Sequence, residues 1–245
     1  MMPMKVSVLL SLLLFNFTIV AAPQVQINDL VEVVDHDRTT LQKQVYNLGD
    51  MTAFVRTEVR EVEYDKIGQE HNRSAVDGVR ENGLHISPAR MIIPSGSFQV
   101  SRALYVGPRD KERYFRVRFS PTLPKDEDRF GLNKDEANDY HKKLGRSGFQ
   151  LLSGYGVLYI IKPVKGVYNT IITNDGGFIN ILNGGNSSIR LQGFSECKKN
   201  GGDCGLSQDI FITPGITKNM PKKPGHIYSF YLVENDDSVK KTVIE

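Results

Sequence analysis

Short stretches of alternating apolar and polar residues, separated by turn residues, make up most of this chain. The segments 52–62, 98–106 and 114–119 alternate as half-buried β-strands do. Turn-forming groups lie between such segments, at Asn82-Gly83, Pro94-Ser95-Gly96 and Gly107-Pro108. No segment sustains the apolar period of an amphipathic helix. The pattern predicts an all-β protein with two immunoglobulin-like β-sandwich domains in series.

One long stretch departs from this alternation. Residues 121–148 are polar, with six acidic and six basic residues, and we expect a long loop that is either functional or simply part of the surface. An apolar strand follows at 149–161 and ends at Lys162-Pro163. Because proline cannot donate to a β-ladder, Pro163 marks a domain boundary. The predicted domains are 23–162 and 163–245.

The first 22 residues have the features of a cleavable secretory signal peptide. Lys5 precedes an apolar run, Val6 to Phe15, and Ala21 and Ala22 close the segment. The alternative is a membrane anchor, but residues 6–22 contain four polar residues and are shorter than the roughly 20 apolar residues that a span needs. We expect export, and no membrane span in the mature chain.

The composition bears on the partners of the chain and on the state of its cysteines. The 245 residues include 31 Lys+Arg and 28 Asp+Glu, for a net charge of +3, which gives no reason to expect nucleic-acid binding. The two cysteines are too few for a four-cysteine zinc site. Cys197 and Cys204 flank a polar turn, so in an oxidising compartment they predict a disulfide, the alternative being two buried thiols.

Motifs for catalysis are missing from the sequence. The five histidines are scattered, and neither a Gly-x-Ser-x-Gly elbow nor a phosphate-binding glycine loop occurs. Asp126 and Asp128 begin like a calcium loop, but Phe130 and Ala137 occupy its fifth and twelfth positions. We expect no enzymatic activity, no cofactor and no metal.

Two neighbouring runs carry a resemblance to a known family. The first contains Pro88, Pro94, Gly96 and Arg102, and the second joins Gly-Pro-x-Asp to Glu-Arg-Tyr-Phe-Arg at 107–116. This resembles the PapD-like periplasmic chaperones of the chaperone–usher pathway, most closely the alternate branch that serves common-pilus-type fimbriae. The resemblance covers about 84–163 and continues weakly into the second domain.

The resemblance implies two immunoglobulin-like sandwiches set at an angle. It also implies a periplasmic chaperone whose partners are pilin (fimbrial) subunits and an outer-membrane usher. A pilin lacks its last strand, and the chaperone supplies one by donor-strand complementation. The alternative is an exported structural or adhesive pilus subunit, which would carry a donor extension near Pro23–Asp29.

The strand 149–161 is the candidate donor strand. Phe149, Leu151, Tyr155 and Val157 share one face at period two, and we favour them as the subunit-binding residues. The alternative is that this face belongs to the core of the chain's own sandwich. A bulge, or the Gly154/Gly156 pair, would exchange the two faces.

A bound subunit's terminal carboxylate calls for a cation. Leu158 stands where the conventional branch has a lysine, and residues 29–34 contain no arginine, so that anchor is not carried over. In 114–119 the alternation places Arg116 and Arg118 opposite three apolar residues. Arg116 is the first candidate anchor, followed by Arg118 and Arg102, the alternative being solvated surface arginines. We expect Lys162 to pair across the domain cleft, as the family's residue there does.

Overall fold

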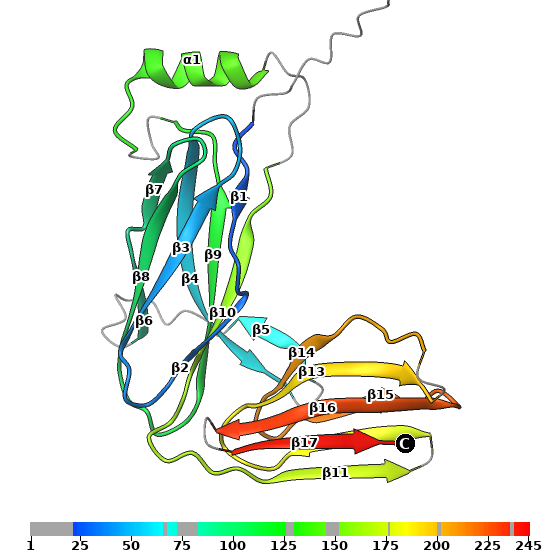
Figure 1. The fold of residues 1–245 in the computed structure, drawn as a ribbon. Coiled ribbons are helices and arrows are strands. Elements are labelled where there is room, and N and C mark those ends of the chain that lie inside the picture. Colours follow the sequence, from blue (N-terminus) through cyan, green and yellow to red (C-terminus); the bar gives the residue numbers. More distant parts are fainter. Residues whose placement is uncertain are drawn as a thin grey trace, which may run out of the picture.

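The computed structural model describes residues 22–65, 68–72, 83–125, 130–145, 152–175, 177–199, 202–235 and 238–245. Figure 1 shows two β-sandwiches joined at an angle, with one helix at the far end of the first. The predicted all-β, two-sandwich class is confirmed. The predicted signal peptide, apart from Ala22, lies outside the described residues.

Two facing sheets form the first sandwich. One has the spatial order β1 (Val25–Gln26), β3 (Thr40–Asn47), β8 (Phe98–Val106), β6 (Gly83–Ser87). The other has the order β2 (Val31–Val34), β10 (Tyr155–Ile161), β9 (Arg113–Pro121), β4 (Ala53–Tyr64), β5 (Glu70–Asn72), and β7 (Arg90–Ile93) also pairs with β4. On β9 the alternation holds as predicted, because Phe115, Val117 and Phe119 are buried in the core.

The N-terminal segment contributes to both sheets of the first sandwich. β1 pairs with β3, and after residues 27–30 the chain enters the other sheet as β2, which runs parallel to β10. Val25 and Ile27 are buried in the core. The segment that a pilus subunit would use as a donor extension is thus built into the chain's own sandwich.

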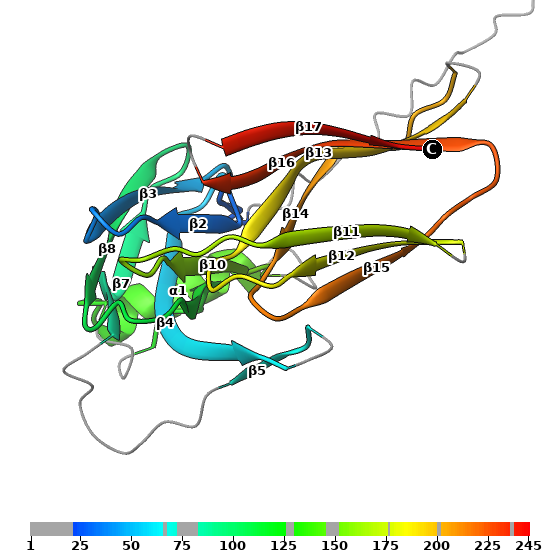
Figure 2. The ribbon, with the colours of Figure 1, turned by 90° about the horizontal axis from the view of Figure 1, so that it is seen from below.

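The second sandwich also consists of two sheets. The smaller has the order β11 (Thr170–Asp175), β12 (Phe178–Asn183), β15 (Thr217–Pro221). The larger has the order β14 (Gln208–Ile212), β13 (Ile189–Lys198), β16 (His226–Asn235), β17 (Ser238–Ile244), and Figure 2 shows the two layers from below. Ile179, Ile181, Ile189 and Leu191 are fully buried between these sheets.

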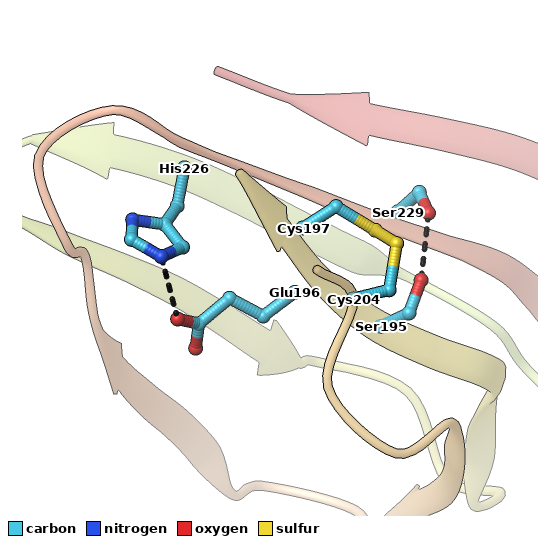
Figure 3. The surroundings of a disulfide bond; sticks show 6 residues. All are labelled: Ser195, Glu196, Cys197, Cys204, His226 and Ser229. Atoms are coloured by element: carbon cyan, nitrogen blue, oxygen red, sulfur yellow. Dashed lines mark hydrogen bonds and ion pairs between the residues drawn. A yellow bond between two sulfur atoms is a disulfide. The ribbon is translucent and has the colours of Figure 1, made fainter. Parts of the chain in front are cut away.

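The predicted disulfide between Cys197 and Cys204 is present in the second sandwich (Figure 3). It joins the end of β13 to the segment that leads into β14. Beside it, Glu196 Oε1 forms an ion pair with Lys223 Nζ at 2.7 Å and lies 3.6 Å from His226 Nε2. The bond thus closes the polar turn between these strands.

A buried asparagine with the same role occurs in each sandwich. Asn47 ends β3; its Nδ2 donates to the carbonyls of Met51 (2.7 Å) and Ile93 (3.0 Å), and its Oδ1 accepts the Gly49 N–H (3.1 Å). Asn183 ends β12 and makes the corresponding bonds, to Ser187 (2.8 Å), Ile212 (2.9 Å) and Gly185 (3.0 Å). Each side chain ties a turn to a strand of the opposite sheet and leaves no polar atom unpaired.

The structure corrects the expectation of a loop without regular structure at 121–148. Residues Lys134–Gly145 form the helix α1. It begins with a capping box: Asn133 Oδ1 accepts the Glu136 N–H and Glu136 Oε2 accepts the Asn133 N–H, each at 2.9 Å. The Asn-x-x-Glu spacing was the sequence signal for this helix.

Helix α1 covers the far end of the first sandwich (Figure 1). Tyr140 donates to the Thr52 carbonyl at 2.7 Å and stacks edge-on against Phe54, with the ring centres 5.0 Å apart. Ala137 and Leu144 are buried on the same side of the helix. Tertiary contact with the sandwich therefore stabilises a helix whose other faces are polar.

We predict that Asn47→Ala lowers the free energy of unfolding by roughly 2–4 kcal/mol, because it leaves buried backbone groups without partners. Urea unfolding followed by circular dichroism measures the change. Gln42→Ala, an exposed position on the same strand, is the control. Equal stability of the two variants would contradict the role assigned to Asn47.

Candidate functional site

Strand β10 is bonded along one edge for its whole length and along the other for only part of it. Its register with β9 runs from Tyr155 to Ile161, but its register with β2 begins at Leu158. The first bond on that side is from Leu158 N to Leu30 O, at 2.8 Å. Among the described residues, no strand pairs with Tyr155–Val157 on the β2 side. An edge of this kind can accept a further strand.

The side chains of β10 correct part of the predicted binding face. Val157 is fully buried in the core of the first sandwich, and Tyr155 packs against that core. The reason is the register with β9, which places them opposite the buried Val117 and Phe119. Tyr155 and Val157 therefore point inward and belong to the core of the chain's own sandwich, which was the alternative to a binding face. Phe149 and Leu151 lie outside the described residues.

The outward face of β10 is covered close to the hinge, which is the junction of the two sandwiches at Lys162-Pro163. Leu158 and Ile160 form a second apolar cluster, in which the other members are Val62, Val31, Val33, Tyr64, Tyr114 and Phe211. Phe211 comes from β14 of the second sandwich, so this cluster joins the two domains. Because β2 pairs with β10 from Leu158 onward, a strand added on this edge can bond only before Leu158.

A buried charge network lies between the sandwiches. Glu112 accepts hydrogen bonds from Ser188 N at 2.8 Å, from Ser188 Oγ, and from Tyr114 OH at 2.6 Å. Lys162 Nζ lies 3.7 Å from Glu112 Oε2 and donates to Ser188 O at 2.6 Å. Lys162 thus contacts residues of both sandwiches at the domain junction. This network fixes the start of the second sandwich against the end of the first.

Arg109 holds the other side of the hinge. Its Nη1 donates to the carbonyls of Asp35 at 3.0 Å and Lys162 at 3.1 Å, and its Nη2 donates to Arg38. A cavity of about 460 Å³ adjoins this clamp and is lined by residues of both sandwiches. Arg109 therefore ties the turn after β2 to the interdomain segment.

Arg116 reaches from β9 to the open edge of β10. Its Nη1 donates to the Gly156 carbonyl at 3.1 Å, and its Nε donates to Glu70 Oε1 at 3.1 Å, while Nη2 pairs with Glu70 Oε2. Hydrogen bonding to Arg116 holds the pKa of Glu70 below its usual range. Burial, and then the nearby Glu70, raise the pKa of Tyr64, which stays protonated and donates to that carboxylate at 3.0 Å.

The other two candidate arginines are placed differently. Arg118 is exposed on β9, on the same face as Arg116 and one step farther along the strand. Arg102 is exposed on β8, which belongs to the opposite sheet of the sandwich. Of the three, Arg116 is the one with a hydrogen bond to β10 in the structure.

Metal-binding clusters and membrane-spanning helices are two further kinds of feature that could occur in the described part of the chain. Within it, no cluster of three or more His, Cys, Asp or Glu residues is arranged to hold a metal ion. No helix in the same residues is long and apolar enough to cross a membrane.

Comparison with known proteins finds a relative of this chain. No family model matches the chain. The chain is 22% identical over 218 residues to the "Probable fimbrial chaperone EcpB" of Escherichia coli, covering 87% of this chain and 88% of that protein. The chain is a homologue of this probable fimbrial chaperone over most of its length.

Solved structures of fimbrial chaperones share its fold. The "Class 5 Fimbriae Chaperone CfaA" superposes with a TM-score of 0.54 at 15% identity, over 91% of this chain and 99% of that one. The SafB chaperone of Salmonella enterica, in complex with the SafA pilin, superposes with a TM-score of 0.52 at 14% identity, over 89% and 93%. The two-sandwich architecture of this chain is therefore shared with these chaperones over nearly its whole length.

Sequence reasoning missed Glu112, Arg109 and Glu70. Glu112 lies in the Glu-Arg-Tyr-Phe-Arg run, and its alternation with Tyr114 and Arg116 was visible. Its partner Ser188 is 76 residues away, so only the folded chain brings them together.

We predict that Glu112→Ala destabilises the chain by about 3 kcal/mol, because Lys162 and Ser188 N–H lose a buried partner. The angle between the sandwiches should also become variable, which small-angle X-ray scattering detects as a larger maximum dimension. Asp110→Ala, an exposed acid two residues away, is the control. A scattering profile unchanged from wild type would count against the hinge role.

Proposed function

We propose that this protein is a periplasmic chaperone that binds fimbrial subunits by donor-strand complementation and delivers them to an outer-membrane usher. The half-open edge of β10, in a chain homologous to fimbrial chaperones, is the observation that carries the proposal. Fimbrial chaperones act in the periplasm, which agrees with the signal peptide proposed for residues 1–22. The proposed domains remain 23–162 and 163–245.

The backbone of β10 supplies the affinity in this proposal. Its even-numbered residues bond toward β2, as Leu158 N and Lys162 N do. The N–H and C=O of Gly156 therefore face the open edge, where a subunit strand can bond to them. Because the subunit's own edge is covered in the complex, it is protected from aggregation.

Side chains just before β10 fill the groove of the subunit in this proposal. Phe149 and Leu151 are the candidates, each worth about 1.5–3 kcal/mol when fully buried. Gly154 lies so close to β9 that a Cβ on it would come within 2.9 Å of Phe119 O. This close approach favours Gly154 as the point where the segment leaves the sheet's regular register.

Arg116 is the proposed anchor for the subunit's carboxylate. It contacts the open edge through Gly156, and its guanidinium already binds one carboxylate in a forked arrangement. Arg118 is the second candidate, since it shares that face. Arg102, on the opposite sheet, is not retained in the proposal.

We predict that Leu151→Asp and Phe149→Asp each reduce the recovered subunit by roughly tenfold or more, because a carboxylate cannot enter an apolar groove without a large desolvation cost. The chain, tagged at its C-terminus, is purified from the periplasm of cells expressing fimbrial subunits. Mass spectrometry then quantifies the co-purified subunit.

Leu152→Asp is the matched control for the choice of face, and the thermal midpoint of each variant shows that it is folded. Loss of the subunit with Leu152→Asp but not with Leu151→Asp would overturn the assignment of residues. Recovery of the wild-type chain with no subunit would overturn the proposed function.

A further inference from the structure

The hairpin of β4 and β5 curls over the outward face of its own sheet. β4 pairs with β9 as far as Val62, opposite Tyr114, and then continues with β5. Figure 2 shows β4 curving strongly into β5. Tyr64 packs edge-on against Tyr114, with the ring centres 5.1 Å apart. The hairpin is thereby held over the strands that carry the proposed site.

This position brings the carboxylate of Glu70 onto Arg116. Both oxygens of Glu70 engage the guanidinium, and Tyr64 OH donates to Oε2 at 3.0 Å. The side chains of Arg116 and Glu70 are 24% and 30% exposed, so the pair is reachable from solvent. Arg116 is therefore already occupied by a carboxylate of the same chain.

The same guanidinium also occupies a backbone acceptor that an added strand would use. Arg116 Nη1 donates to the Gly156 carbonyl at 3.1 Å, on the open edge of β10. A Cβ at position 156 would come within 3.3 Å of Arg116 Cδ, so glycine gives this side chain room to cross the strand. Arg116 thus joins the hairpin to the open edge.

We propose that Glu70 is an internal competitor for the carboxylate of a bound subunit, so that the β4–β5 hairpin partly inhibits the empty site. This inference rests on the proposed function. An incoming strand displaces Arg116 from Gly156 and exchanges its own carboxylate for that of Glu70. A strand without a carboxylate at this position leaves the Arg116–Glu70 pair in place and binds more weakly.

The Arg116–Glu70 ion pair is weak enough for a subunit carboxylate to replace Glu70 reversibly. A partly exposed ion pair contributes little net free energy, so its removal should change affinity by roughly two- to fivefold. A fully buried pair would resist exchange, because each charge would then lose its partner in a region without water. The exposure of Arg116 and Glu70 places this pair in the exchangeable range.

The experiment compares Glu70→Gln with Glu58→Gln. Glu58 pairs with Arg60 at 3.6 Å on β4, so its variant removes an equal charge without touching Arg116. The first readout is the amount of subunit recovered from the periplasm. We expect Glu70→Gln to raise it roughly two- to fivefold over wild type, Glu58→Gln to leave it unchanged, and Arg116→Gln to lower it.

A second readout does not require a subunit. Purified protein without a bound subunit is titrated with N-acetylvaline, and the Arg116 Nε–Hε resonance is followed by nitrogen-15 NMR. We expect the titration midpoint for Glu70→Gln to be roughly two- to fivefold lower than for wild type and for Glu58→Gln. Arg116→Gln identifies the resonance by its loss.

The two readouts distinguish failure of the proposed chaperone function from failure of the proposed competition by Glu70. Tighter binding of N-acetylvaline by Glu70→Gln with no subunit recovered by any variant contradicts the proposed function and leaves the competition intact. Subunit recovered equally by Glu70→Gln and Glu58→Gln, with equal titration midpoints, overturns the competition alone. Lower recovery with a folded Glu70→Gln overturns it as well, because Glu70 would then position Arg116 instead of competing for it.

Discussion

The partial pairing of β10 is the constraint around which the first sandwich is organised. Its second half is bonded on both edges, to β9 and to β2, and its side chains fill both the sandwich core and the domain junction. Its first half is bonded on one edge only. The half that is bonded on both edges thus continues directly into the half that has one open edge.

The charge network at the hinge holds the second sandwich against the outward face of β10. Glu112 and Lys162 place the second sandwich against the outward face of β10, and Phe211 completes the apolar cluster there. This charged network restricts the relative orientation of the two sandwiches more than apolar contact alone would, because each of its hydrogen bonds tolerates only a narrow range of geometry. The register with β2, which begins at Leu158, determines how much of β10 remains open.

The outward face of the first sandwich carries its charges close to the open edge. Arg116 lies beside Gly156, Glu70 and Tyr64 lie over Arg116, and the same strand places Tyr114 in the domain junction. Alternation along β9 therefore has two consequences. One face builds the core, and the other connects the hinge to the proposed binding edge.

The sequence by itself determined the β class, the alternation of β9 and the disulfide, because each depends on neighbours along the chain or on a single pairing. It also contained the capping box of α1, which went unrecognised within a polar stretch. The inward orientation of Tyr155 and Val157 was decided by the register with β9, since alternation alone defines two faces without saying which one is covered. Tertiary structure alone joined Glu112 to Ser188 and Glu70 to Arg116, because those contacts depend on how the two sandwiches pack and how β4 curls.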